Sequence, residues 1–252
     1  MNHPPCIFCA NESGSEEHLW PDWMHRLVIF APINMQEADG PVIVGQDPEQ
    51  TINTVCRTCN NGWMSQIEQK CVSRLKPMLL NQPLEIDPGG MKLLTEWAVL
   101  RAMVFESIKP RNDNENFYAR EERIAFREGQ TIPDRTRVWV GALEKSHIGY
   151  HGTDFTLEEK GERVGTGSVG TVYAGHIVMQ VVTEHLSVEA QPGGIIVPPP
   201  GPWDQRLVEI HPNRPRRVNW PTQPFTDEGP TGIIALHARW RMGKKTNKIK
   251  NL

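Results

Sequence analysis

Four of the five cysteines in this 252-residue chain form two identical short motifs. Two residues separate Cys6 from Cys9, and two separate Cys56 from Cys59. Such a gap lets one tight turn present two sulfurs to one ion, and four thiolates satisfy a tetrahedral Zn²⁺ completely. A redox dithiol would need each pair at a helix N-terminus in a βαβ context, which the sequence around Cys6 does not offer. The spacing therefore favours one structural Cys₄ zinc site, with Cys71 left over as a small buried residue.

The segment between the two cysteine pairs places an acid directly before a histidine. Glu17 precedes His18, and Pro21 follows three residues after the histidine. Because proline interrupts regular structure, we expect a short strand to end at His18 and a loop to begin at Pro21. An imidazole held at such an edge has an unperturbed pKa suited to proton transfer near neutral pH. The alternative interpretation is an ordinary surface or structurally bonded histidine.

Taken in order, the stretches "CIFC", "SEEHLWP" and "VCRTCNNGW" resemble the zinc-containing HNH endonucleases of the ββα-metal fold. The resemblance is closest to the HNH proteins of bacteria and their phages, and it covers roughly residues 1 to 75 of the chain. It implies that a zinc knuckle braces two strands and a helix. It also implies that Asn60, directly after the last cysteine of the motif, projects from the start of this helix toward His18.

The resemblance further implies a role for each residue of the site. His18 would be the general base, while Glu17 and Asn60 would bind a catalytic Mg²⁺ or Mn²⁺. Many family members carry histidine where Asn60 stands, and the middle asparagine of the family falls about five residues before the third cysteine, at Thr51. Asn53 is the nearest candidate to orient the imidazole, because a shift of two residues keeps the same strand face. If these departures disable cleavage, the protein is a non-catalytic, zinc-containing nucleic-acid-binding or interaction protein.

The rest of the chain predicts a second folded unit. A helix over residues 60–75 should end at Pro77, and residues 81–90 resemble a linker. Apolar spacing then predicts helices over 91–108 and 117–129, followed by strands over 135–144, 171–185 and 205–210. We therefore expect an α+β protein, with a zinc-braced HNH domain over residues 1–76 and an α+β domain over residues 88–252. The second domain should have two helices and a mostly antiparallel sheet.

The glycine-rich stretch "GTGSVGTVYAG", Gly165 to Gly175, matches the phosphate loop of protein kinases. A kinase would also need a lysine on the next strand together with H-R-D and D-F-G motifs, and the chain has none of them. An apolar strand pattern rather than a helix follows the glycines, which excludes a dinucleotide-binding fold. We expect a glycine-rich hairpin turn at this position.

The charge of the chain is mildly negative, with a formal net charge of -3. Local basic segments can still bind phosphate, and the two candidates contain Arg214, Arg216 and Arg217 in one case and Lys244 and Lys245 in the other. By resemblance, the expected partner is nucleic acid, with DNA favoured over RNA. A protein partner of the C-terminal domain is a further possibility, and the sequence leaves the oligomeric state open.

The sequence also bears on where the protein resides. No run approaches about 18 consecutive apolar residues, which excludes an ordinary membrane-spanning helix. The first residues lack a charged region followed by an apolar one, which is the pattern of a secretory signal. We therefore expect a cytoplasmic protein without membrane contact.

Overall fold

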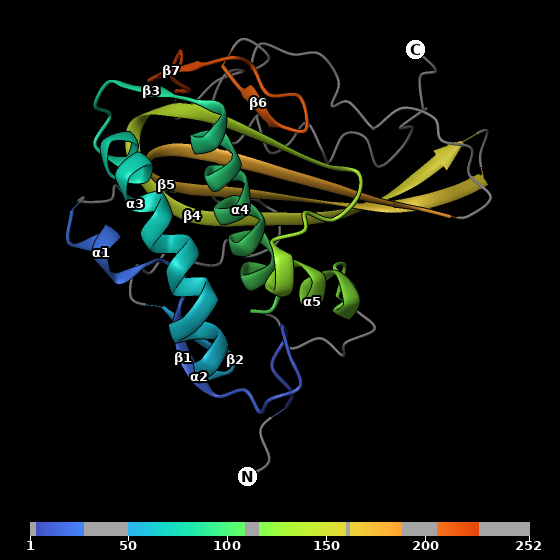
Figure 1. Ribbon diagram of the computed structural model, residues 1–252. Helices are drawn as coiled ribbons and strands as arrows, with labels where there is room; N and C mark the ends of the chain where they lie inside the picture. The colour runs from blue at the N-terminus through green and yellow to red at the C-terminus, as the bar shows by residue number, and fades with distance from the viewer. Residues whose placement is uncertain (1–3, 28–49, 109–115, 160–161, 188–205, 227–252) are drawn as a thin grey trace, which may run out of the picture.

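The computed structural model describes residues 4–27, 50–108, 116–159, 162–187 and 206–226. It has the α+β class expected from the sequence, with helices packed against antiparallel sheets (Figure 1). Its described elements begin with a small hairpin and continue through a series of helices to a sheet made from two long strands and one short one, while the last short strand pairs with a strand between the helices.

The N-terminal hairpin pairs β1 (Ser15–His18) with β2 (Thr51–Val55) in antiparallel fashion. The strand predicted to end at His18 is therefore confirmed. The prediction that a loop begins at Pro21 is wrong, because the short helix α1 (Asp22–His25) begins directly after this proline. Proline interrupts a helix interior but is tolerated at its start, where no intrahelical N–H partner is needed.

Three helical segments follow β2 without a break. They are α2 (Arg57–Cys59), the π-helical segment η1 (Asn60–Met64) and α3 (Ser65–Leu79). The expected end of the helix at Pro77 is wrong, since α3 includes this proline and continues to Leu79. A proline so close to the end removes a single helical hydrogen bond, while Met78 and Leu79 gain full burial. The chain then leaves the helix at Asn81, which has a left-handed φ of 54°.

The predicted linker contains regular structure. Its strand β3 (Leu84–Ile86) pairs with β7 (Val218–Trp220), a partner more than a hundred residues away in sequence. The helix α4 (Pro88–Glu106) starts directly afterwards, where the Asp87 carboxylate accepts a hydrogen bond of 2.6 Å from the N–H of Gly90. An aspartate cap followed by proline in the first turn is a strong helix start, which explains why α4 begins before the apolar run.

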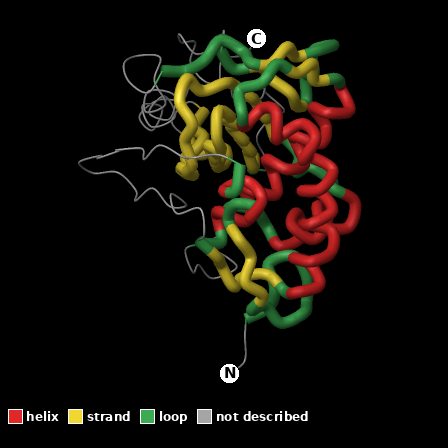
Figure 2. The backbone as a smooth tube through the Cα atoms, turned by 90° about the vertical axis from the view of Figure 1, so that its left-hand side faces the viewer, coloured by secondary structure: helices red, strands yellow, loops and turns green. Residues whose placement is uncertain are grey.

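The main sheet has the strand order β5-β4-β6 and is antiparallel throughout. Its strands are β4 (Thr136–Glu159), β5 (Glu162–Leu186) and β6 (Val208–His211), and α5 (Arg120–Gly129) precedes them. Helices α3 and α4 lie side by side and both contact β5 (Figures 1 and 2). The two predicted helices over 91–108 and 117–129 and the predicted antiparallel sheet are thus present.

The glycine-rich segment is a strand rather than the expected hairpin turn. Gly165 to Gly175 lie within β5, and the reversal of the chain falls between Glu159 and Glu162. Aromatic rings of the neighbouring strand cover two of these glycines: a Cβ at Gly167 would lie 2.3 Å from the Phe155 ring, and one at Gly170 would lie 3.0 Å from Tyr150 Oη. The absent side chains therefore make room for rings, which is how a glycine-rich strand stays packed.

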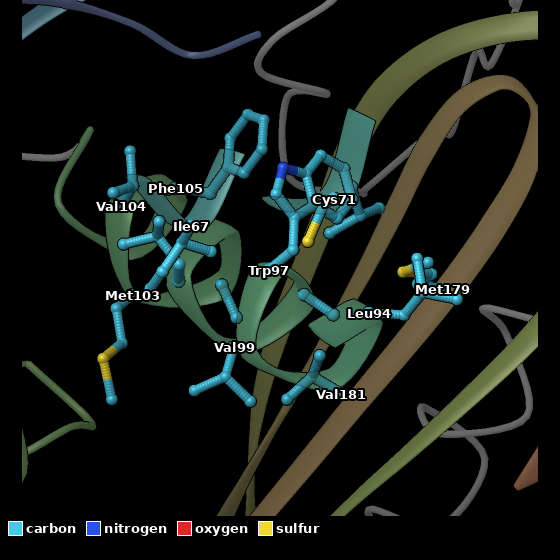
Figure 3. Close-up of a cluster of buried hydrophobic side chains, with 14 of the residues drawn as sticks. Ile67, Cys71, Leu94, Trp97, Val99, Met103, Val104, Phe105, Met179 and Val181 are labelled. Carbon is cyan, nitrogen blue, oxygen red and sulfur yellow. The ribbon is translucent and has the colours of Figure 1, made fainter. Parts of the chain in front are cut away.

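One buried apolar cluster extends from the cysteine motifs to the sheet. Figure 3 shows its centre, where residues of α3, α4 and β5 meet: Ile67, Cys71, Leu94, Trp97, Met179 and Val181. The cluster crosses the expected boundary between residues 76 and 88 without interruption. Because this shared core does not mark where one domain ends and the next begins, the division of the chain into domains 1–76 and 88–252 stays a prediction. Among the described residues, no helix combines the length and apolar character needed to cross a membrane.

Candidate metal centre and the adjoining histidine site

The cysteines of the two C-x-x-C motifs converge on one point. The sulfurs of Cys6, Cys9, Cys56 and Cys59 all lie within 4.8 Å of one another, and all four side chains are buried free thiols. Cys9 Sγ lies 3.5 Å from Cys56 Sγ and 3.7 Å from Cys59 Sγ. Four sulfurs about 2.3 Å from one Zn²⁺ would be about 3.8 Å apart in a tetrahedron, so these separations fit. The cluster could therefore hold a metal ion such as zinc.

In both motifs a backbone N–H group donates a hydrogen bond to a cysteine sulfur. The N–H of Phe8 donates to Cys6 Sγ over 3.5 Å, and the N–H of Cys59 donates to Cys56 Sγ over 3.4 Å. The second bond makes Cys56 the cap of α2, so the helix start and the ligand turn are one structure. N–H donors directed at sulfur stabilise the thiolate, which is the form that binds metal.

The thiol pKa values differ in direction across the cluster. Burial acts to raise the pKa of Cys56, but hydrogen bonds from the Cys59 backbone and from neighbouring thiols outweigh it and lower the pKa to about 7. Burial raises the pKa of Cys6 to about 11. Because a ligand thiol must lose its proton, metal binding at this cluster releases protons and weakens as pH falls.

Helix α5 supports the first motif from outside the hairpin. Arg120 Nη2 donates to the carbonyl of Cys9 over 2.8 Å, and Nη1 donates to the carbonyl of Cys6 over 3.5 Å. The Trp63 ring meets Phe8 edge-on with centroids 5.0 Å apart, and it meets Phe126 of α5 at 5.8 Å. Local sequence patterns could not point to Arg120, because these contacts join segments more than a hundred residues apart.

Asn60 joins the start of the helical segment to the hairpin. It follows Cys59 directly, and its Nδ2 donates to Ser15 Oγ and to the carbonyl of Glu16, each over 3.0 Å. Both acceptors belong to β1, the strand that ends at His18. With the amide nitrogen engaged on the strand, the side-chain oxygen of Asn60 is the atom that could bind a cation.

Strand register sorts the other predicted site residues onto two faces. His18 pairs with Thr51, and Glu17 pairs with Ile52. Because paired residues point to the same face, Glu17 shares the buried face with Ile52, while His18 shares the opposite face with Thr51. Asn53 is exposed and lies two residues from Thr51, so it belongs to the face of the half-buried His18. The structure thus brings Asn53 to the histidine face and directs Glu17 away from it.

The Glu17 carboxylate is occupied by a buried arginine of α4. Arg101 Nη2 lies 3.2 Å from Glu17 Oε1 and 3.0 Å from Glu68 Oε1, with side-chain exposures of 0% for Arg101 and 6% for Glu17. Burial raises the pKa of Glu17 to about 7, and the charge of Arg101 opposes that rise. Arg101 Nη1 also donates to the carbonyls of His18 (3.3 Å) and Leu19 (3.0 Å). A cation at Glu17 would therefore have to share the carboxylate with Arg101 or displace it.

Sequence reasoning missed Arg101, Glu68 and His25 at this site. Arg101 did leave a signal, since it is a charged residue within the apolar run "WAVLRAMVF" of a buried helix. Glu68 left none, because an acid near the start of a helix is normally solvated. His25 lies beyond Pro21 in the sequence, yet α1 returns it to His18, with ring centroids 6.2 Å apart.

The predicted basic segments lie away from this site or outside the described residues. Arg214, Arg216 and Arg217 are exposed in the loop between β6 and β7. Arg217 Nη1 is 2.9 Å from Glu85 Oε2, so an exposed ion pair already engages this side chain. The elements β6 and β7 lie at the opposite end of the molecule from β1, β2 and α2 (Figures 1 and 2). Lys244 and Lys245 fall outside the described residues.

No protein family, curated protein or solved structure was found to match this chain. Its function therefore has to be inferred from the residues of the site.

Proposed function

We propose that the protein is a metal-dependent HNH endonuclease that hydrolyses phosphodiester bonds in nucleic acid, with DNA as the favoured substrate and a structural Cys₄ zinc. The supporting observation is the position of Asn60. This residue follows the cysteine cluster directly and is hydrogen-bonded to β1, the strand that ends at the half-buried His18. A hairpin, a cysteine cluster and a helix start in this relation are what a ββα-metal module would require.

Each residue has a defined task in this proposal. His18 accepts the proton of the attacking water, and Asn53, on the same strand face, orients the imidazole. The Asn60 side-chain oxygen binds the catalytic Mg²⁺ or Mn²⁺, and Glu17 joins it if the Arg101 ion pair opens. When bound, that ion would offset the negative charge that grows on the leaving oxygen. The zinc cannot serve here, because four thiolates leave it no open position.

The two predicted domains would have different functions. Residues 1–76 would form the nuclease unit, and residues 88–252 would place the nucleic acid or a protein partner. The ion pair and hydrogen bonds of Arg101 connect α4 to β1. A change in how the second segment binds its partner could therefore reach the site through Arg101.

A plasmid-cleavage assay tests this function. Zinc-loaded protein should nick or linearise supercoiled plasmid with Mg²⁺ or Mn²⁺, and should not do so in buffer without added divalent ion or in EDTA. Single-stranded DNA and RNA are run beside the plasmid to identify the substrate. The zinc content is measured in every sample, because EDTA could also remove the structural metal. Failure to cleave any substrate with either ion, in protein that retains zinc and fold, would contradict the proposal.

A second candidate function rests on the buried state of Glu17. A carboxylate that is 6% exposed and paired with Arg101 is not presented to solvent as a cation ligand normally is. This observation favours a zinc-containing nucleic-acid-binding or interaction protein without catalysis. Such a protein would shift the same substrates in an electrophoretic binding assay and leave them intact with either ion.

A further inference from the structure

The two cysteine motifs are held in place in different ways. Cys56 caps α2 and Cys59 is its last residue, so the second motif is built into a helical segment that continues through η1 and α3. The first motif belongs to neither a helix nor a strand. A backbone hydrogen bond of 3.3 Å, from the N–H of Cys9 to the carbonyl of Cys6, closes its turn. The positions of the first two sulfurs therefore depend more on contacts from elsewhere in the chain.

Arg120 of α5 makes such a contact. Its Nη2 donates to the carbonyl of Cys9 over 2.8 Å, and its Nη1 donates to the carbonyl of Cys6 over 3.5 Å. The planar guanidinium thus spans the turn from outside and bonds the backbone of both ligand residues. A rotation of either peptide group that carried a sulfur away from the cluster would break one of these bonds.

Helix α5 is anchored to the main sheet, so the position of Arg120 does not depend on the cysteine turn alone. Glu122 Oε1 lies 2.9 Å from Nε2 of His185 in β5. Glu122 Oε2 accepts a hydrogen bond of 2.8 Å from the N–H of Ala119, the residue directly before the helix. Both contacts fix the first turn of α5, which is the turn that carries Arg120.

Aromatic packing joins α5 to both motifs independently of Arg120. The Trp63 ring, four residues after Cys59, contacts Phe8 inside the first motif at a centroid distance of 5.0 Å and Phe126 of α5 at 5.8 Å. Phe8 and Phe126 are fully buried. Because these rings hold α5 against the cluster, a substitution of Arg120 should remove its polar contacts while the helix stays in place.

The charge of Arg120 also suits a zinc site. Four thiolates around one Zn²⁺ leave the centre with a net negative charge. The guanidinium stays protonated under ordinary conditions, and it is bonded to the backbone of two of the four ligand residues. Its positive charge therefore opposes the repulsion among the thiolates, in buried surroundings where screening by solvent is weak.

We propose that Arg120 is a positioning residue of the zinc site, which holds the carbonyls of Cys6 and Cys9 so that both sulfurs stay on the metal. The metal centre then consists of the two cysteine motifs and a support from α5, which lies more than a hundred residues after the first motif. Loss of an outer-shell partner typically weakens metal binding by about 10- to 100-fold. This inference goes beyond the proposed function, because it concerns the structural metal and holds whether or not the protein cleaves nucleic acid.

Competition for zinc tests the inference. Zinc-loaded wild type and variants are mixed with an excess of a chelating dye near neutral pH, and the absorbance of the dye reports zinc affinity and the rate of zinc release. Arg120→Ala should weaken zinc binding by about 10- to 100-fold and release zinc faster. Arg120→Lys should lose less, because lysine keeps the positive charge but lacks the planar fork that bonds two carbonyls.

Arg137→Ala is the matched control. Arg137 is also half-buried, and its guanidinium also makes two hydrogen bonds, of 2.9 Å and 2.7 Å to Glu209, but these lie in the main sheet. This variant should bind zinc as the wild type does. The unfolding free energy of every variant is measured, because a purely structural role of Arg120 predicts that both arginine variants lose zinc in proportion to their loss of stability.

Three outcomes would overturn the inference: no zinc binding by the wild type, wild-type zinc affinity in Arg120→Ala, or equal weakening in Arg120→Ala and Arg137→Ala. If Arg120→Ala fails to fold, the same comparison is made between Arg120→Lys and Arg137→Lys. Arg120→Lys must then bind zinc more weakly than Arg137→Lys, and equal affinities would overturn the inference. A failure to cleave plasmid leaves this result untouched, so the nuclease proposal and the role of Arg120 can fail separately.

Discussion

At the scale of single residues, two kinds of polar group hold the N-terminal region together. The four cysteines approach one another around a point that fits a tetrahedral ion. Arg101, fully buried, binds two carboxylates and two carbonyls that belong to β1, α3 and the chain after His18. Removing a cysteine of the cluster or removing Arg101 leaves buried polar groups without partners, which is costly in a low-dielectric interior.

The cysteine cluster leads to a direct prediction about zinc. Purified protein should contain about one tightly held Zn²⁺ per chain, and Cys56→Ser should lose it and unfold the N-terminal hairpin, because site formation and folding are coupled. Metal analysis and hydrogen exchange on residues 50–64 measure the two effects. Cys71→Ser is the matched control, since Cys71 is buried outside the cluster and should keep its zinc. A folded, zinc-free N-terminal region would contradict the prediction.

Glu106 predicts a dependence of stability on pH. This carboxylate accepts hydrogen bonds from the N–H groups of Phe117 and Tyr118, yet burial raises its pKa from 4.5 to about 7. Between these two pKa values the folded state binds more protons than the unfolded state. The contribution of protonated Glu106 to the unfolding free energy is therefore complete below pH 4.5 and is lost as pH rises to about 7. Buried Glu17 acts in the same direction.

Urea unfolding at pH 5 and pH 8 measures this effect. The unfolding free energy of the wild type should be lower at pH 8 than at pH 5. The decrease should be smaller in Glu106→Gln, because glutamine does not titrate. An equal fall in both proteins would show that Glu106 carries no such dependence.

At the scale of elements, the sequence predicted what local spacing determines. The strand that ends at His18 follows from the break at Pro21, and the buried helix α4, the amphipathic helix α5 and the strands of the main sheet follow from periodicity. Pairings between distant segments did not follow, as β3 and β7 show, because a three-residue strand has no periodic signal of its own. His25 was missed for the same reason, since only the turn into α1 places it beside His18.

The glycine-rich strand was misjudged because glycines there serve packing rather than chain reversal. Gly175 is the clearest case: its φ of +58° is left-handed, and a Cβ would lie 2.8 Å from both the side chain and the carbonyl oxygen of Leu79. We expect Gly175→Ala to lower the unfolding free energy by about 1–3 kcal/mol or more.

Gly89→Ala is the control for this prediction. Gly89 lies in the first turn of α4, where a Cβ would be 3.5 Å from Asp87 Oδ1 and meets nothing closer. Alanine is favoured over glycine in helices, so this variant should be neutral or slightly stabilised. Denaturant unfolding compares the two, and equal stability of both variants would contradict the account of β5.

At the scale of the whole molecule, the candidate site and the arginine loop lie far apart. The loop between β6 and β7 is at the opposite end of the fold from β1, β2 and α2 (Figure 1). A nucleic acid that contacts both would have to extend along the molecule. The composition could not reveal this arrangement, since a net charge of -3 says nothing about where the positive groups lie.

The arginine loop predicts the salt dependence of nucleic-acid binding. If Arg216 contacts a phosphate, Arg216→Ala should weaken duplex binding and reduce the slope of log K against log salt by about 0.9. Lys92→Ala is the control, because Lys92 is an exposed cation of α4 and lies 3.8 Å from Glu96. Fluorescence anisotropy between low and moderate salt measures both. An unchanged slope in Arg216→Ala would remove this loop from the proposed interface.

Cleavage by the His18→Ala variant tests the central claim most directly. Initial rates on plasmid are compared at saturating substrate for the wild type, His18→Ala and the control His176→Ala, each with its zinc content and unfolding free energy measured. His176 is the matched control because it is also half-buried, and its ring bonds the carbonyl of Leu143 over 2.9 Å. We predict that His18→Ala keeps zinc and fold and loses activity by on the order of 10²- to 10⁴-fold, while His176→Ala cleaves as the wild type does. A folded, zinc-loaded His18→Ala variant that cleaves at the wild-type rate would contradict the assignment of this site as a nuclease centre.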